Sequence, residues 1–552
     1  MFARFPLRRL IFVIRPLRSP AAAALLALLL GLLASPILPA QERSTAAPRP
    51  SLLVVVTVDQ LRPEYLERWD GQFRGGFRRL IDEGAFFVRA AQDHGVTETA
   101  PGHASILSGR FPYSTGIASN SAGVNTTASP LVDAEGNGAA PFRFQGTTLA
   151  DWMAAAEPQT RMLSVSRKDR GAILPIGRGS YPVFWYAQST GGFTTSTWYA
   201  DSLPAWVRAF NAEQWVTRRY AGRLWDLLEG IGSYPELDET PAEARSQEPR
   251  FPHRLPADPM LARNLIIGFP YMDELTLDFA WAGVRALELG QGPQTDLLAV
   301  SLSTTDAVGH RWGPDSREVH DHLLRLDRML GLFLDSLAAL RGGDRIVVAL
   351  TADHGVAPSP DGRSSWGDNR RASRVSLDDF SRAFQSAMPY IASSGIPADA
   401  FDFDGFTLAV DRARVPGKDR VLQEIATAFA NEARRVPGVM RADVLDRLSR
   451  ADTVKDAIAR RWLHSFRPGG DVLAVVTLEP YHIFDGGNTA THGSPHDYDA
   501  QVPLILWGAP FQAGRRTESV RVVDLAPTLA ELLGISPLER LDGHPLNGVR
   551  RP

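Results

Sequence analysis

The chain has 552 residues, with 59 Lys or Arg against 62 Asp or Glu, so its formal net charge is −3. This near balance gives no support to a nucleic-acid partner, and 44% hydrophobic with 22% charged residues argues against disorder and fibrous repeats. Cysteine is absent, which excludes disulfides, thiolate metal ligands and a cysteine nucleophile. Any metal must therefore be held by nitrogen and oxygen ligands.

Residues 1–40 have the layout of a secretory signal peptide. Several arginines precede an apolar run over 21–34, which is too short to span about 30 Å of hydrocarbon comfortably. Cleavage near Ala40 is expected, which predicts an exported protein, periplasmic or extracellular, without stable membrane association after cleavage. The alternative is an uncleaved membrane anchor.

The mature region, residues 50–552, opens with a continuous apolar run over 52–58 that ends in Asp59. Such runs are typical of strands buried on both faces of a sheet. Similar runs over 296–303 and 345–351 also lead into acidic residues. Because ligands gather at the carboxyl ends of strands in open α/β sheets, these three strands are predicted to deliver acidic side chains to one edge.

An amphipathic helix is predicted between the last two of these strands. Apolar residues recur at intervals of three and four over 319–340, and two consecutive glycines end the pattern. Asp315 with Glu318 is interpreted as its capping box, and His320 and His322 are expected to face solvent. Strand, helix and strand with short connections form a βαβ unit, which predicts a doubly wound, mainly parallel α/β sheet with helices on both faces.

Two segments interrupt this alternation, and we interpret them as insertions near the active-site edge of the sheet. Residues 176–275 are rich in Trp and Tyr and contain repeated prolines, which disfavour helices and interior strands. Residues 360–480 contain clusters of Arg, Ser and Asp and a helical pattern over 421–433. The core is expected to resume with a strand over 502–507 and a helix over 524–533.

Aspartate and histidine side chains cluster at the predicted strand ends. One pair is separated by four residues, a second pair is adjacent, and a further histidine lies in a loop containing glycine and proline. Each cluster alone would more often be structural, but their common position favours a metal site. The candidate ligands are Asp59, Asp306, His310, Asp353, His354 and His492.

This number of ligands is too large for one tetrahedral ion and suits two adjacent ions. Imidazole together with carboxylate favours zinc, although manganese and iron satisfy the same ligand preferences. Two ions about 4 Å apart stabilise both the attacking and the leaving oxygen of an in-line displacement at phosphorus. The ligand set therefore predicts phosphoryl-transfer chemistry.

The segment from Thr97 to Ser105 offers a nucleophile for that chemistry. A helix starting near Pro101 would leave Thr99 beside the amide-rich, positive end of the helix. A hydroxyl bound to a metal there can ionise near neutral pH and attack phosphorus. Thr99 is therefore the candidate nucleophile.

Six short motifs together resemble the alkaline phosphatase superfamily and, within it, the PafA-type bacterial alkaline phosphatases that use a threonine nucleophile. The similarity covers nearly the whole mature chain. The motifs are Val58 to Pro63, Thr99 to His103, Lys168 to Ala172, Asp306 to His310, Ala352 to Gly355 and His492 to Pro495.

This resemblance implies two Zn²⁺ ions and assigns each candidate ligand to one of them. One site would consist of Asp306, His310 and His492, and the other of Asp59, Asp353, His354 and the Thr99 oxygen. The resemblance also implies that nonbridging phosphoryl oxygens are held by Asn120, Lys168 and Arg170. Without it, Lys168 and Arg170 would indicate a solvated charge cluster, although on an extended segment both would point the same way.

The leading hypothesis is an exported two-zinc phosphomonoesterase, an alkaline phosphatase that acts on small-molecule phosphate monoesters through a covalent phosphothreonine. The alternative is a phosphodiesterase or nucleotide pyrophosphatase of the same superfamily. Lys168 and Arg170 argue against it, because a diester substituent would occupy part of their space. A sulfatase is disfavoured because residues 99–103 lack its Cys/Ser-x-Pro-x-Arg motif. A noncatalytic phosphate- or metal-binding protein on the same scaffold is a hypothesis from another class.

Overall fold

The computed structural model describes residues 49–238, 240, 243, 248–361 and 372–551. The predicted signal peptide, residues 1–40, lies outside the described residues. Within the described ranges, no helix combines the length and the apolar character needed to cross a membrane.

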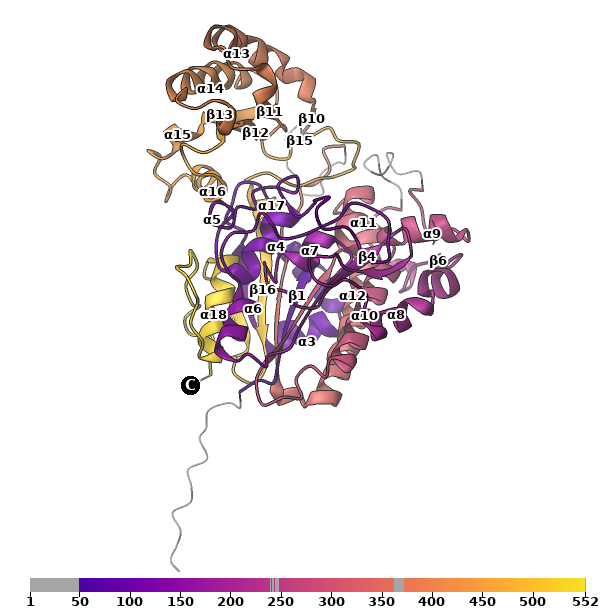
Figure 1. Ribbon diagram of the computed structural model, residues 1–552. Helices are drawn as coiled ribbons and strands as arrows, with labels where there is room; N and C mark the ends of the chain where they lie inside the picture. Colours follow the sequence, from indigo (N-terminus) through magenta and orange to yellow (C-terminus); the bar gives the residue numbers. More distant parts are fainter. Residues whose placement is uncertain (1–48, 239, 241–242, 244–247, 362–371, 552) are drawn as a thin grey trace, which may run out of the picture. The chain divides into compact units, whose positions relative to one another are not determined.

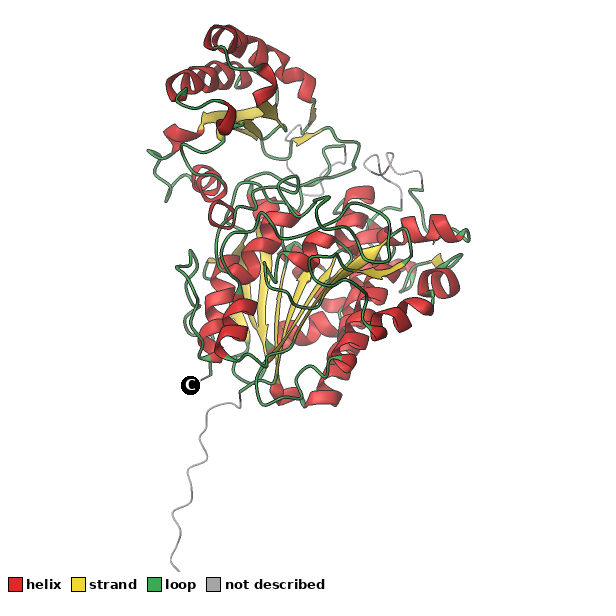
Figure 2. Ribbon diagram, viewed as in Figure 1, coloured by secondary structure: helices red, strands yellow, loops and turns green. Residues whose placement is uncertain are grey.

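A ten-stranded sheet forms the core of the described chain, with helices on both faces (Figure 2). The central strand β1 (Leu52–Val58) pairs in parallel with β8 (Asp296–Leu302) and β9 (Ile346–Thr351), as predicted. On the β9 side, β16 (Gln501–Trp507) is followed by β2 (Ala85–Ala91), and both β17 (Gly514–Arg516) and β18 (Val520–Arg521) pair with β2 at this edge. On the β8 side, the order is β3 (Met162–Ser166), β4 (Val183–Ala187) and β5 (Gly192–Thr194). The predicted α/β class is confirmed, with β16 antiparallel to both of its neighbours.

Helices on the two faces position the ends of these strands. In one group, α12 (Arg317–Arg341) contacts both α3 (Gly76–Glu83) and α10 (Tyr271–Ala286). Another is α4 (Thr99–Ser108), α6 (Leu149–Ala156), α7 (Asp169–Ile173) and α18 (Leu525–Leu533). Every residue of β1 is buried, which explains why its sequence is continuously apolar instead of alternating.

Helix α12 confirms the predicted amphipathic helix, but two details of the prediction are wrong. The N-cap is Ser316, whose side chain accepts a hydrogen bond from Val319 N, so Asp315 does not cap the helix. His320 and His322 are fully buried instead of facing solvent. His320 stacks on Trp69 at 4.4 Å between ring centroids. Helical periodicity identifies the face that packs on the sheet, but it does not show that other segments cover the opposite face.

The segment predicted as the first insertion, residues 176–275, contributes two strands to the core sheet. Strand β4 pairs in parallel with β3, and β5 pairs with β4 in an antiparallel register. The part that leaves the sheet includes a short antiparallel pair, β6 (Leu224–Trp225) and β7 (His253–Arg254). Aromatic and β-branched residues favour strands, so the Trp and Tyr content of β4 is a strand signal as well as an insertion signal.

Within the range predicted as the second insertion, 360–480, a smaller antiparallel sheet has the order β11-β12-β14-β13. Helices α13 and α14 pack on each other, and α14 contacts this sheet. The strands are β11 (Phe401–Phe403), β12 (Thr407–Val410), β13 (Val439–Val444) and β14 (Val472–Leu478), and the helices are α13 (Ser381–Ser394) and α14 (Asp419–Ala433). Its buried side chains form a hydrophobic cluster separate from that of the main sheet.

Asp93, which follows β2, anchors helix α16 (Ala457–Ser465) through a buried ion-pair network. Arg460 donates to both carboxylate oxygens of Asp93, at 2.9 and 3.1 Å, and Arg461 and His464 lie within 3.3 Å. Burial would raise the pKa of Asp93, but hydrogen bonds from His464 and Arg460 outweigh it and lower the pKa. The ionised carboxylate is therefore stabilised by folding.

We expect Asp93→Ala to lower the free energy of unfolding by about 3 kcal/mol at pH 7, because it removes the buried carboxylate that Arg460, Arg461 and His464 share. A depressed carboxyl pKa contributes stability above the unfolded-state pKa of about 4, and this contribution is lost as the pH falls below that value. Urea unfolding at several pH values measures the deficit. A deficit as large at pH 3 as at pH 7 would contradict the electrostatic explanation. Arg420→Met, which removes an exposed ion pair with Glu424, should leave stability unchanged.

Candidate active site

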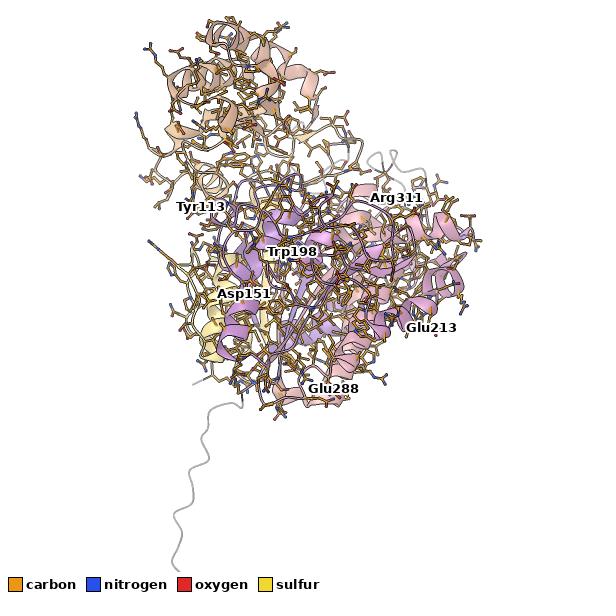
Figure 3. The ribbon with its side chains drawn as sticks, in the orientation of Figure 1. Tyr113, Asp151, Trp198, Glu213, Glu288 and Arg311 are labelled. Carbon is orange, nitrogen blue, oxygen red and sulfur yellow. The ribbon has the colours of Figure 1, made fainter. Side chains whose placement is uncertain are left out.

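Three helices begin at one end of the central strands and surround the candidate site. Figure 1 shows α4, α7 and α11 (Thr304–Trp312) at this end of the sheet. In Figure 3, Arg311 of α11 lies at the same end and Glu288 lies at the opposite end. The ends of β1, β8 and β9 therefore meet at one edge, as the sequence predicted.

Asp306, His310 and His492 form the first potential metal-binding group, with one ligand atom from each lying within 4.8 Å of the others. Helix α11 places Asp306 and His310 four residues apart on one face. Each histidine donates through Nδ1 to a backbone carbonyl, His310 to Ala490 and His492 to Thr97, both at 2.8 Å. Because a carbonyl only accepts, Nδ1 is the donor in each ring, and Nε2 is the atom that faces the candidate metal site.

Asp59, Asp306 and His354 form the second group by the same criterion. His354 Nε2 lies 3.4 Å from Asp59 Oδ1 and 3.6 Å from Asp353 Oδ2. His354 Nδ1 donates to the Gly355 carbonyl at 2.9 Å, so Nε2 again faces the carboxylates. Asp306 is shared between the two groups, which places them side by side.

The electrostatic environment keeps these side chains in different protonation forms. Burial would raise the pKa of Asp306, but Lys168 and His310 outweigh it and hold the pKa well below its usual range. Burial and the neighbouring His492 lower the pKa of His354 well below its ordinary value, so this imidazole is neutral. Burial would also lower the pKa of His492, but its hydrogen bond to Asp306 raises the pKa to about 9. Ligation through His492 would therefore displace a proton.

Several buried polar atoms at this edge make no hydrogen bond within the described residues. They include Asp59 Oδ1, Asp353 Oδ2 and His354 Nε2, all on residues with 0% exposure. Buried polar atoms in folded proteins nearly always have a partner. Unpartnered carboxylate and imidazole atoms that face one another are a donor set suited to zinc, so these residues fit metal ions.

Thr99 is the first residue of α4 and is 1% exposed. The helix begins two residues before the predicted start at Pro101, so Thr99 lies within the first turn, where backbone N–H groups are unpaired. Lys168 Nζ donates to Thr99 Oγ1 at 3.1 Å and lies 2.6 Å from Asp59 Oδ2 and 2.7 Å from Asp306 Oδ2. The ammonium thus contacts the candidate nucleophile and the carboxylates of both Asp59 and Asp306.

Close packing of α4 on the end of β9 requires a glycine at position 102. A Cβ atom there would lie 2.2 Å from the Asp353 carbonyl oxygen. The absence of a side chain lets the helix approach Asp353, and His103, one residue further, lies 3.1 Å from the carboxylate Oδ2 of Asp353 through Nδ1. Gly102 therefore sets the distance between α4, which carries the candidate nucleophile, and the end of β9, which carries Asp353.

Asn120 and Arg170 lie beside the same helix terminus. Asn120 Oδ1 accepts a hydrogen bond from Ala100 N at 2.9 Å, which leaves its amide N–H groups available to another oxygen. Lys168 is the N-cap of α7 and Arg170 is the second residue of that helix. The extended conformation considered for this segment is therefore wrong, because the chain becomes helical after Lys168.

Sequence reasoning missed two residues that orient the ligands. Gln60 donates from Nε2 to Asp306 Oδ1 at 2.9 Å and from its backbone N to Asp353 Oδ1 at 3.2 Å. His103 bonds through Nε2 to Ser301 Oγ at 2.8 Å, behind the site. Both lie inside motifs that the sequence had singled out, and their spacing gave no separate signal of this role.

Residues 53–394 match the family described as type I phosphodiesterase / nucleotide pyrophosphatase. The alkaline phosphatase PafA of Elizabethkingia meningoseptica is 29% identical over 94% of this chain and 98% of its own length. The alkaline phosphatase PhoV of Synechococcus elongatus is 31% identical, covering 88% and 90% of the two chains. The crystal structure of wild-type PafA matches with a TM-score of 0.81 and 28% identity, covering 91% of this chain and 99% of that chain.

Proposed function

Because the chain belongs to the type I phosphodiesterase / nucleotide pyrophosphatase family of the alkaline phosphatase superfamily, we propose that it is an alkaline phosphatase that hydrolyses small-molecule phosphate monoesters. The position of Lys168 is the observation that favours monoesters as substrates. Lys168 Nζ lies within hydrogen-bonding distance of Thr99 Oγ1 and of carboxylates from both potential metal groups. A cation beside the nucleophile favours a phosphoryl group with free, charged oxygens, and a monoester dianion has more charge to neutralise than a diester.

In the proposed reaction, Thr99 Oγ1 attacks phosphorus and loses its proton while the bond from phosphorus to the ester oxygen breaks. The leaving alkoxide departs opposite Thr99 and is protonated. Water then attacks the phosphothreonine, the bond from phosphorus to Oγ1 breaks, and inorganic phosphate and the free hydroxyl form. Lys168, Arg170 and Asn120 bind the nonbridging oxygens in both steps and hold the phosphoryl group in line.

The metal ions in this proposal are two Zn²⁺. One would be held by Asp306, His310 and His492, and the other by Asp59, Asp353, His354 and Thr99. When bound, zinc lowers the pKa of a ligated hydroxyl and neutralises charge that develops on the leaving oxygen. The unpartnered atoms of Asp59, Asp353 and His354 support this assignment.

We also propose that the protein is exported to the periplasm or the extracellular space, without stable membrane association after cleavage and without a nucleic-acid partner. Support comes from the arginine-rich and then apolar sequence of residues 1–40 and from the near-neutral net charge of −3.

A phosphodiesterase remains the second candidate function, because the matching family is described by that activity. The two functions differ in what surrounds the phosphorus. A diester carries a second substituent in place of one charged oxygen, so a cationic contact at that position favours the monoester.

Thr99→Ala should abolish turnover of an aryl phosphate while the protein stays folded, because it removes the attacking oxygen. Thr99→Ser should retain measurable turnover, since it keeps a hydroxyl at the same position. Mass spectrometry after acid quenching should detect a phosphorylated Thr99 peptide in the wild type and not in the alanine variant. Wild-type turnover by Thr99→Ala would rule out the covalent mechanism and leave Thr99 as a structural residue of α4.

We expect turnover to depend on zinc. The purified protein should contain about two zinc ions per chain, and a strong chelator should stop turnover until zinc is restored. His310→Ala should lose one ion before the other, because His310 belongs to only one ligand group. Elemental analysis and activity after dialysis measure both effects. Full activity of the metal-free protein would refute the assignment.

Removing both Lys168 and Arg170 by alanine substitution should lower kcat/KM for a phosphomonoester by about a hundredfold or more. Charge-assisted contacts contribute roughly 1.5–3 kcal/mol each, and about 1.4 kcal/mol is a factor of ten. The loss for the matching diester should be much smaller. Arg178→Ala, at an exposed arginine after α7, is the matched control and should change neither rate. Faster wild-type hydrolysis of the diester would favour the phosphodiesterase.

A further inference from the structure

The smaller sheet extends a rigid turn, residues 404–407, toward the candidate site. Asp404 Oδ1 accepts hydrogen bonds from Phe406 N at 2.9 Å and Thr407 N at 2.7 Å, and its Oδ2 accepts from Thr407 Oγ1 at 3.0 Å. The Phe406 carbonyl accepts from Val476 N of β14 at 2.8 Å. These bonds fix the backbone on both sides of Phe406 and so determine where its ring lies.

The ring of Phe406 lies against the loop that carries His492. A Cβ atom at Gly493 would be 3.2 Å from Phe406 Cε2 and 3.9 Å from Glu98 Cγ. Gly493 has φ +119°, a conformation that favours glycine, so the loop leaves room for the ring. Phe406, Gly493 and Glu98 therefore meet beside His492 on one side and Thr99 on the other.

Phe406 is only half-buried. Its ring packs edge-to-face with Phe484 at 4.9 Å between centroids, which supports it from the smaller sheet. Part of the side chain remains accessible, although Phe406 lies next to buried ligand residues of the main sheet. An aromatic side chain of this kind offers an apolar surface to a bound molecule.

Carboxyl groups surround the same position. Glu98 lies beside Gly493, and its Oε2 accepts a hydrogen bond from Asn120 N at 2.6 Å. The carboxylate of Asp404 closes the turn that carries Phe406. Negative charge around Phe406 disfavours a leaving group that carries its own anionic substituent.

We propose that Phe406 is a specificity-determining residue that contacts the leaving group and favours flat, apolar, uncharged ones such as a phenol. This inference rests on the proposed function, in which the leaving oxygen departs on the side of Asp306, His310 and His492. Gly493 directly follows His492, so a group attached to that oxygen passes the ring of Phe406. The smaller sheet thereby contributes to substrate choice in a site built by the main sheet.

The test compares kcat/KM for phenyl phosphate and methyl phosphate in the wild type, Phe406→Ala and Phe406→Leu. An aromatic contact of this kind changes kcat/KM by roughly three- to tenfold. Phe406→Ala should lower kcat/KM for phenyl phosphate by that factor. It should leave kcat/KM for methyl phosphate and inhibition by inorganic phosphate unchanged. Phe406→Leu keeps apolar packing but lacks a flat face, and should show the same selective loss with a wild-type melting temperature.

Tyr390→Ala is the matched control, because it removes a ring that is 41% exposed on α13 of the same segment. It should change kcat/KM for neither ester. Equal losses for both esters in the Phe406 variants, or no loss, would overturn the inference while leaving the proposed function intact. A wild-type protein that hydrolyses neither ester would overturn the proposed function and this inference together.

Discussion

The candidate site depends on the need to balance the charge of three buried carboxylates at the ends of β1, β8 and β9. Asp59 and Asp353 are fully buried and Asp306 is 5% exposed, so their charge must be balanced within the protein. Lys168 contacts two of them directly, and imidazoles surround all three. This excess of anionic oxygen explains why the site is suited to divalent cations and why the Lys168 ammonium lies beside Thr99.

Backbone groups help to hold this cluster in place. The parallel register of β1 with β8 and β9 brings the three strand ends to one level. Gly102 lets α4 approach the Asp353 carbonyl, and carbonyl acceptors orient the imidazoles of His310 and His492. His310 and His492 are therefore oriented by backbone groups outside the candidate metal site, an arrangement that fixes each ring before any metal binds.

The segments outside the main sheet have different relations to the site. The excursion after β5 covers the outer face of α12, where Trp225 donates to Asp321 at 2.6 Å and His253 lies 2.8 Å from Glu318, so a polar helix face becomes buried. Asp93 holds α16, which precedes β14 of the smaller sheet in the chain, and Phe406 of the smaller sheet reaches the loop of His492. Stability and substrate choice are thus separate contributions of the added segments.

The sequence alone determined the α/β class, the central strands, helix α12 and the residues that could bind metal. These features depend on spacing within one element, since buried parallel strands are continuously apolar and end in the polar groups of the site. The tertiary structure alone decided that β4 and β5 join the sheet, that His320 and His322 are buried, and that Lys168 contacts Thr99. Periodicity records which face of an element is apolar, whereas contacts between distant residues depend on how the elements pack.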